Sequence, residues 1–408
     1  MASQMQFYRP TVAHINLDHL AHNVQILRNA IGENIFFCPM VKANAYGHGD
    51  VDVALRLQQE GVTTLGVGLI EEGQLLRQMG IQIEILVFGT FDLQGAAEIL
   101  RQNLTPVIST WKQLELMERV LPSSSSSLGI HVKFDTGMHR LGFDWLEANK
   151  VFQYLNSKKN FFKVKGILTH LFAAEDSAQT DGKSFEQLQK FREVENIFAP
   201  MKPISHTLNS AGMLNFISMS RGGRGGLPGI SLAQGVRPGL SIYGYSPLAD
   251  PVTGIELKPV MSLRSQVIQI HQLNVGEGVS YGHSWKAGRK SIVGVVPIGY
   301  ADGFHRILSN RALVLYSGQR VPVVGNVCMD HLIIDLTDAF SVQNQSTHEV
   351  TLFGYDNLGN LLPATEVALK SQSITWEILT AVGERVPRIM SEENSREFMP
   401  KKNIEVKP

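Results

Sequence analysis

The chain has 408 residues, of which 43% are hydrophobic and 18% charged, so it is long enough to form two domains with cores of their own. Its 37 basic residues balance its 37 acidic ones, and this zero net charge argues against nucleic acid or an anionic membrane as a partner. A small neutral or zwitterionic substrate suits this composition better.

The cysteines and the N-terminus favour a reducing compartment. Cys38 and Cys328 lie far apart in unlike surroundings, which resembles neither a disulfide framework nor a zinc site, so we expect two reduced thiols and no metal. Residues 1–20 lack the continuous apolar core of a signal peptide, and no apolar run reaches transmembrane length. The expected location is the cytoplasm, with no membrane partner.

The first 246 residues alternate between helical and strand-like patterns. Helical spacing of apolar residues predicts helices at 17–30, 51–59, 93–100, 111–120 and 185–198. Strands are predicted at 36–42, 63–67, 84–87, 106–108, 131–134, 165–169, 205–208 and 234–237. Eight strands over about 230 residues favour a (β/α)8 TIM-like barrel. A doubly wound sheet is the competitor, but no G-x-G-x-x-G opens the first helix.

A mostly-β domain follows the barrel. Strands are predicted at 262–273, 291–298, 313–315, 321–324, 331–336 and 349–353, and a helical segment at 364–382. The extended residues 11–17 could pair with this domain. We therefore expect a barrel over residues 10–246 and a C-terminal β domain over 247–408, which residues 1–9 could join.

Two low-complexity inserts are expected to be surface loops. The first, Pro122 to Ser127, contains five consecutive serines. The second, Arg221 to Gly229, is rich in glycine, but it lacks the G-K-[ST] ending of a phosphate-binding loop and opens onto no helix.

Lys42 stands out because it follows the apolar run 35–40 and precedes Tyr46 and two glycines. A buried amine is driven toward its neutral form, and a neutral lysine is a nucleophile that forms Schiff bases with carbonyl groups, including that of pyridoxal phosphate. The alternative is a structural lysine whose head reaches water.

Further polar groups fall at the predicted C-terminal strand ends, where barrels carry their active sites. They are Tyr46, Lys133, Arg140, His170, Asn209, Ser210, Arg237 and Gly239. Two buried cations as close as Lys133 and Arg140 would repel, unless both lie at the surface. A neutral Lys133 amine could instead take up carbon dioxide, and the resulting carbamate would pair with Arg140.

These segments, in their order and spacing, resemble bacterial alanine racemase, a pyridoxal-phosphate enzyme of fold type III. The resemblance covers residues 9–388 and rests on V-K-A-N-A-Y-G-H-G, D-T-G-M-H-R-L-G, Thr169-His170, N-S-A, V-R-P-G-L-S-I-Y-G, G-V-S-Y-G, G-Y-A-D-G, C-M-D and R-V-P-R.

The resemblance implies a site for pyridoxal 5′-phosphate, held covalently through the Lys42 amine. Tyr46, Ser210 and the amides of Gly239 and Leu240 would bind its phosphate, with Asn209 and His170 completing the cofactor site. Arg237 would face the pyridine nitrogen without protonating it, which leaves the ring a weaker electron sink and limits side reactions.

The resemblance also implies a two-base racemisation of alanine that supplies D-alanine for peptidoglycan. Lys42 and Tyr281 would serve opposite faces of the cofactor-bound substrate. Tyr281 would come from the partner subunit of a homodimer. Arg140 and the Met329 amide would bind the substrate carboxylate, and Asp330 and Tyr300 would line the mouth.

The chain departs from the family at two residues near this mouth. Glu384 replaces a common tyrosine before R-V-P-R, and Asn326 replaces a common arginine before V-C-M-D. Both bear on substrate range, so a broader or serine-type racemase stays an alternative. A decarboxylase of the same fold and a non-enzymatic pyridoxal-phosphate carrier are further alternatives; the carrier would end after the barrel.

Overall fold

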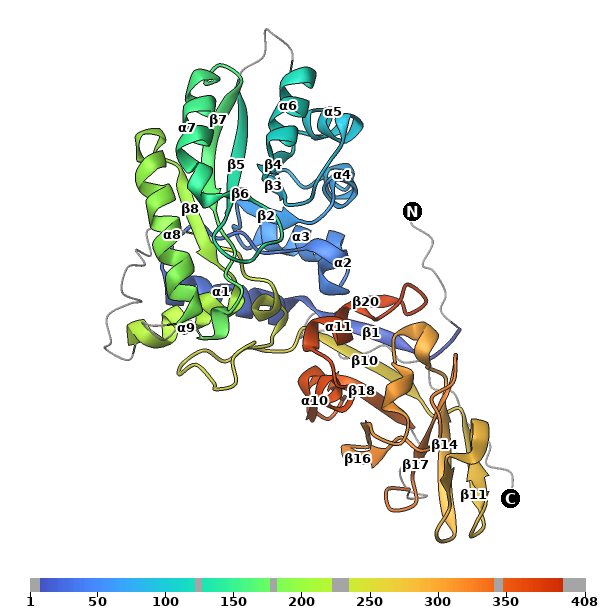
Figure 1. Ribbon diagram of the computed structural model, residues 1–408. Coiled ribbons are helices and arrows are strands. Elements are labelled where there is room, and N and C mark those ends of the chain that lie inside the picture. Colours follow the sequence, from blue (N-terminus) through green and yellow to red (C-terminus); the bar gives the residue numbers. More distant parts are fainter. Residues whose placement is uncertain (1–7, 122–126, 177–181, 222–234, 341–347, 392–408) are drawn as a thin grey trace. The chain divides into compact units, whose positions relative to one another are not determined.

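The computed structural model describes residues 8–121, 127–176, 182–221, 235–340 and 348–391. These residues divide into two compact units (Figure 1). The β unit comprises residues up to Leu20, Tyr46–Gly49 and residues from Pro259 onward. The barrel unit comprises Ala21–Ala45 and Asp50–Lys258.

Seven parallel strands form the sheet of the barrel unit, in the order β2-β3-β4-β5-β7-β8-β9. Residues 37 and 40 close it, because Phe37 pairs with Val236 of the last strand and Met40 pairs with Gly66 of the first. The strands are β2 Thr64–Val67, β3 Glu84–Val87, β4 Thr105–Ile108, β5 Leu128–Asp135, β7 Phe162–Leu168, β8 Ile204–Leu208 and β9 Gly235–Val236, with the short β6 Phe143–Asp144 beside β5.

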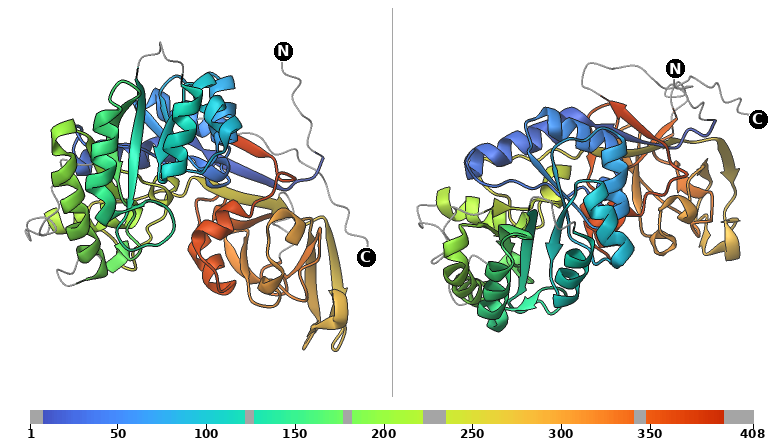
Figure 2. Two further views of the ribbon diagram at one scale, coloured as in Figure 1. Left: turned by 45° about the horizontal axis from the view of Figure 1, so that its top comes forward. Right: turned by 90° about the horizontal axis from the view of Figure 1, so that it is seen from above.

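Helices surround these strands, and the views in Figure 2 show them on the outer side of the sheet. They are α1 Leu17–Ile31, α3 Asp50–Gln59, α4 Ile70–Gln78, α5 Leu93–Arg101, α6 Trp111–Val120, α7 Ala148–Ser157, α8 Lys183–Phe198 and α9 Ser210–Arg221, with 3-10 turns η1 Trp145–Glu147, η2 Ala174–Asp176, η3 Ala199–Met201 and η4 Leu240–Tyr243. Side chains cap several of them: Asp92 accepts a hydrogen bond from Gly95 at the start of α5, and Thr110 accepts one from Gln113 in α6.

The predicted strand at 36–42 is only partly formed. Its pairing is limited to the two bridges at residues 37 and 40, because Pro39 has no N–H to donate to a ladder. Lys42 does not continue a strand but begins α2, Lys42–Tyr46, in which Ala43, Asn44, Ala45 and Tyr46 have φ between 50° and 55°. Four consecutive non-glycine residues thus adopt the left-handed conformation, which costs each about 1–2 kcal/mol.

The β unit contains a large mixed sheet in the order β16-β15-β18-β10-β1-β20, in which β1 lies between β10 and β20 as the extended residues 11–17 suggested. A second sheet has the order β11-β14-β17. The strands are β1 Val12–Asn16, β10 Met261–Gln266, β11 Gln269–Leu273, β12 Gly278–Val279, β13 Trp285–Lys286, β14 Ser291–Val296, β15 Leu313–Tyr316, β16 Gln319–Pro322, β17 Leu332–Asp335, β18 Glu349–Tyr355, β19 Leu361–Leu362 and β20 Arg388–Ser391.

Two predicted elements of the β unit are each broken in two. The strand expected at 262–273 forms β10 and β11, which belong to different sheets. The helical segment expected at 364–382 forms α10 Ala364–Lys370 and α11 Thr375–Thr380, because Gln372 takes a left-handed φ of 56°. The remaining turns are η5 Tyr281–His283, η6 Tyr300–Asp302 and η7 Arg306–Leu308.

The predicted fold class, a β/α barrel with a mostly-β C-terminal region, is confirmed. Residues 122–126 and 222–229 of the two inserts lie outside the described residues. Across the described part of the chain, no helix combines the length and apolar character needed to cross a bilayer.

Because β1 is paired on both sides, by β10 and by β20, we predict that Ile15, whose side chain is fully buried, matters to stability. Ile15→Ala should lower the free energy of unfolding by about 2–5 kcal/mol, because it leaves a cavity beside β10 and β20. The measurement is calorimetric thermal unfolding, with Val275→Ala as the control, since Val275 is 67% exposed. Equal unfolding midpoints for the two variants would contradict this prediction.

Candidate active site

Lys42 is fixed through the backbone of the residue that follows it. The Ala43 N–H donates a 2.6 Å hydrogen bond to Glu72, whose other carboxylate oxygen accepts from Gly68 and Leu69 just after β2. Partial burial lowers the pKa of the Lys42 amine, and Arg140 lowers it further, while Glu72 acts in the opposite direction. Glu72 therefore anchors the left-handed turn, and its negative charge partly opposes the fall in the pKa of the amine.

Arg237 is buried after β9, and its charge is satisfied by neutral acceptors. Its guanidinium donates to the carbonyl of Thr169 at 2.7 Å, to the carbonyl of His206 and to His206 Nδ1 at 2.9 Å. Burial lowers the pKa of Arg237 to about 10, so the group stays charged at neutral pH.

The Arg237 contact fixes the protonation of two histidines inside the barrel. Arginine can only donate, so His206 Nδ1 accepts and its proton lies on Nε2. That Nε2–H donates to His131 Nδ1 at 2.7 Å. Burial lowers the pKa of His131 to about 4 and that of His206 well below its ordinary value, so both rings are neutral.

Further basic groups gather at the same strand ends. Lys133, on β5, is buried, and burial together with Arg237 and Arg140 lowers its pKa to about 8. Burial lowers the pKa of His170, which follows β7, to about 3, and the charges of Arg237, Lys133, Arg140 and Lys42 act in the same direction. Lys42, Lys133 and His170 thus all hold a proton less readily than their free side chains, and neighbouring basic residues contribute to this in each case.

Ser210 links the start of α9 to the turn after β9. Its hydroxyl oxygen accepts from the Gly239 N–H at 2.9 Å and from the Ser241 N–H at 3.3 Å. Leu240 begins the buried turn η4 directly after Gly239. Asn209 was expected to bind a cofactor; its side-chain oxygen accepts from the Gly212 N–H at 3.0 Å and caps α9.

Tyr46 belongs to the β unit and is buried. Burial raises the pKa of its phenol to about 12, so the hydroxyl keeps its proton and can donate. The next residue must be glycine: Gly47 has φ 83°, and a Cβ there would lie 2.3 Å from the carbonyl oxygen of Leu379.

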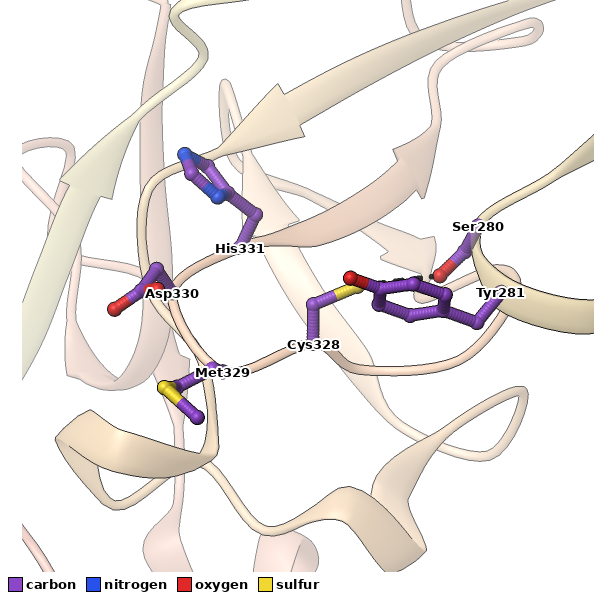
Figure 3. Close-up of a pocket in the computed structure, with 6 residues that line it drawn as sticks. All are labelled: Ser280, Tyr281, Cys328, Met329, Asp330 and His331. Atoms are coloured by element: carbon purple, nitrogen blue, oxygen red, sulfur yellow. Dashed lines mark hydrogen bonds between the residues drawn. The ribbon is translucent and has the colours of Figure 1, made fainter.

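Tyr281 lines an open pocket of the β unit with Ser280 and the facing loop 328–331 (Figure 3). Its side chain is 74% exposed, and that of Met329 is 53% exposed. The Tyr300 N–H donates to the Cys328 carbonyl and the Ala301 N–H to the Met329 carbonyl, both at 3.0 Å. The G-Y-A-D-G segment therefore supports the loop that carries Met329.

Asp330, which was expected to line the mouth of the active site, forms an ion pair with Arg385. Arg385 donates to it at 2.6 Å and holds the pKa of the carboxyl below its usual range. Arg385 also lies 3.5 Å from Asp302, which is fully buried and bonds Arg9 at 2.8 Å. Glu384, beside Arg385, is exposed.

Sequence reasoning identified most of these residues but missed Glu72, His131 and His206. Glu72 could have been suspected, because an acid in the first turn of a helix often bonds backbone amides ahead of it. The histidines lie within β5 and β8 and read as ordinary core residues.

The lowered pKa of Lys133 predicts a pH effect on stability. In buffers free of carbon dioxide, the unfolded chain binds a proton at Lys133 that the folded chain does not, between a pH of about 8 and the ordinary 10.5, so the free energy of unfolding rises with pH by up to about 3 kcal/mol. Lys133→Met should reduce this rise, measured by denaturant unfolding from pH 7.5 to 10. The exposed Lys112→Met is the control and should keep the native slope. Identical slopes for native protein and Lys133→Met would refute the assignment.

Comparison with known proteins agrees with this geometry. Residues 15–247 match the family model "Alanine racemase, N-terminal domain" and residues 260–390 match "Alanine racemase, C-terminal domain". The chain is 37% identical to alanine racemase of Sorangium cellulosum, over 94% of this chain and 100% of that protein.

Solved structures show the same relationship. The alanine racemase structure of Clostridium difficile 630 has a TM-score of 0.84 at 30% identity and covers 95% of this chain and 97% of its own. A Bartonella henselae alanine racemase, described as having covalently bound pyridoxal phosphate, has a TM-score of 0.80 at 28% identity, covering 94% and 99%. Because family models match both domains and a relative is 37% identical over 94% of this chain, the chain belongs to the alanine racemase family.

Proposed function

We propose that this protein is a pyridoxal-phosphate-dependent alanine racemase that interconverts L- and D-alanine and supplies D-alanine for peptidoglycan. The observation that carries the proposal is an amine of lowered pKa, Lys42, set among basic groups at the strand ends of a barrel whose family racemises alanine. The proposed cofactor-binding domain is residues 10–246. Location in the cytoplasm stays a prediction.

The residues present fit the cofactor. Within the described residues, Arg237 contacts only carbonyl oxygens and a neutral imidazole, so the region keeps a net positive charge suited to an anionic ligand. Ser210 begins a 12-residue helix whose N-terminus favours a phosphate, and Gly239 lets backbone approach it closely. We propose that Ser210, Tyr46, Gly239 and Leu240 hold the phosphate and Lys42 the aldehyde carbon.

Racemisation requires a proton to leave one face of Cα and another to reach the opposite face. Bound pyridoxal phosphate supplies the electron sink that makes this Cα–H acidic. Lys42 Nζ carries the proton at one face, where its lowered pKa leaves part of the amine free as a base. Tyr281 Oη carries the proton at the other.

Arg237 and His170 tune these steps. Arg237 holds its protons tightly, so it would face the ring nitrogen without protonating it, which limits the electron sink. His170 is neutral, because burial lowers its pKa, and in the proposed dimer its imidazole would face the Tyr281 phenol and accept its proton.

Substrate binding completes the proposal. Arg140 and the Met329 N–H would bind the carboxylate, with Asp330 and Tyr300 at the mouth. Lys133 would orient Arg140 as a carbamate: its neutral amine nitrogen adds to the carbon of carbon dioxide and releases one proton, which converts the neutral amine into an anion. The Lys133 pKa of about 8 makes that neutral amine available.

We further propose a homodimer in which Tyr281 completes the partner's site. The supporting observation is the 74% exposure of Tyr281, the tyrosine to which we assign the second base. A non-enzymatic carrier built on the barrel alone is disfavoured, because the chain also matches the C-terminal racemase domain.

Two variants test the separate roles proposed for Lys42 and Tyr281. Lys42→Ala should remove the visible absorbance of the lysine-bound cofactor together with activity. Tyr281→Phe should keep that absorbance but reduce racemisation by a factor of 100 or more, on the order of a lost acid–base catalyst. Tyr8→Phe, at an exposed tyrosine, is the control. Racemisation that survives in Tyr281→Phe would refute the two-base assignment.

Substrate breadth is the point on which a serine-type racemase stays a candidate, because Glu384 and Asn326 replace residues near the entrance. We expect alanine to give the highest kcat/KM in a panel with serine and lysine, measured by chiral chromatography of the products. A higher kcat/KM for serine would select the alternative function.

A further inference from the structure

The loop that carries Tyr281 has an unusual backbone. Ser280 has φ 60° and ψ −175°, a region that glycine occupies readily and other residues almost never do. Gly282 and His283 also have positive φ, of 71° and 44°. Tyr281 thus lies between residues whose conformations are unfavourable or need glycine, so the loop requires outside contacts to keep its shape.

Asn326 supplies those contacts in both directions. Its side-chain Nδ2 donates to the carbonyl oxygen of Tyr281 at 2.7 Å. Its own carbonyl accepts from the Ser280 hydroxyl at 2.6 Å. The Ser280 hydroxyl also lies 3.3 Å from the Cys328 sulfur. Asn326 therefore holds the peptide that follows the Tyr281 Cα and the side chain of the residue that precedes it.

Gly325 lets the segment 325–326 approach the loop that carries Tyr281. A Cβ on Gly325, which has φ 75°, would lie 2.9 Å from the Ser280 Cβ. The Gly325 N–H is held in turn by Asn310 at 2.6 Å, and Asn310 also donates to Ser284 at 3.1 Å on the far side of the Tyr281 turn. The segment 325–326 is thus built to lie directly against the tyrosine loop.

We propose that Asn326 is a positioning residue for the second base: with Ser280 it clamps the strained backbone that aims the Tyr281 phenol. This rests on the proposed role of Tyr281. The family resemblance related Asn326 only to the substrate passage and did not suggest that it positions Tyr281. An arginine at this position would differ from asparagine in length as well as charge.

The test removes the hydrogen-bond donor of Asn326 and keeps the shape of its side chain. Asn326→Asp has the same shape but cannot donate to the Tyr281 carbonyl, and Asn149→Asp, on the exposed face of α7, is the charge-matched control. We expect Asn326→Asp to lower kcat at least 10-fold, with KM within about twofold and unchanged cofactor absorbance. Native-like kcat in Asn326→Asp would overturn the proposal.

Isotope exchange separates positioning from general damage. In deuterated water, the Cα proton of one alanine enantiomer should still exchange at near-native rate through Lys42, while exchange from the other enantiomer falls with kcat. Equal loss for both enantiomers would indicate a merely structural role and contradict the proposal.

A second pair of variants covers the case in which Asn326→Asp does not fold. Ser280→Ala loses the hydroxyl and keeps the unfavourable backbone, whereas Ser280→Gly loses the hydroxyl but adopts that backbone freely. We expect Ser280→Gly to retain at least fivefold more activity than Ser280→Ala; the reverse order would overturn the clamp. If Tyr281→Phe remains active, both the two-base assignment and the clamp are refuted. If Tyr281→Phe is inactive and Asn326→Asp has native-like kcat, only the clamp is refuted.

Discussion

The charge of Arg237, which is buried at the carboxyl ends of the barrel strands, influences the protonation of the residues around it. A buried cation without a counter-ion is expensive unless its donors find acceptors, and here carbonyls and a neutral histidine accept from both terminal nitrogens of Arg237. Because that histidine must accept from Arg237, its own proton is directed to His131. Two core histidines are thereby fixed in one tautomer, and the positive charge is left available to the site.

The same constraint shapes the neighbouring amines. Burial is the main cause that lowers the pKa of Lys133 and of Lys42; Arg237 and Arg140 add to it at Lys133, and Arg140 adds to it at Lys42. Asp135 opposes the shift at Lys133, and Glu72 opposes it at Lys42. Glu72 places one oxygen on the Ala43 amide and the other on two amides after β2, so much of its bonding capacity goes to the backbone.

The sequence was sufficient to predict the barrel and the β region, because apolar periodicity is a local signal. Polar groups at strand ends suggested part of the candidate site, whereas Tyr281 and Met329 were suggested only by the family resemblance. The left-handed turn after Lys42 could not be predicted, since Ala43, Asn44 and Ala45 are not glycine and only tertiary contacts enforce their conformation. The histidine pair was missed for a similar reason: its meaning lies in a contact between β5 and β8, which lie 75 residues apart. The break within 262–273 escaped notice because both halves have strand character.

Different interactions fix the positions of the two proposed bases. Lys42 follows a closed sheet whose strands are almost wholly buried, so its position is determined by the barrel as a whole. Tyr281 lies on an exposed loop, and its position depends on a few hydrogen bonds from the facing segment. Loops carried on a rigid scaffold commonly hold functional residues, and they tolerate variation in which residue does the holding.

The place of β1 has a consequence for how the chain folds as it is synthesised. β1 is among the first described residues, yet its partners come much later: Thr11 bonds Ser265, 254 residues on, and Ser391 bonds Ile15, 376 residues on. Until β10 has been translated, both edges of an apolar strand stay open to pairing with other chains. Barrel strands have partners that emerge sooner, so the barrel can form first. The nascent chain must then carry an unpaired strand through most of its synthesis, and this interval is when it is most exposed to aggregation and most dependent on chaperones.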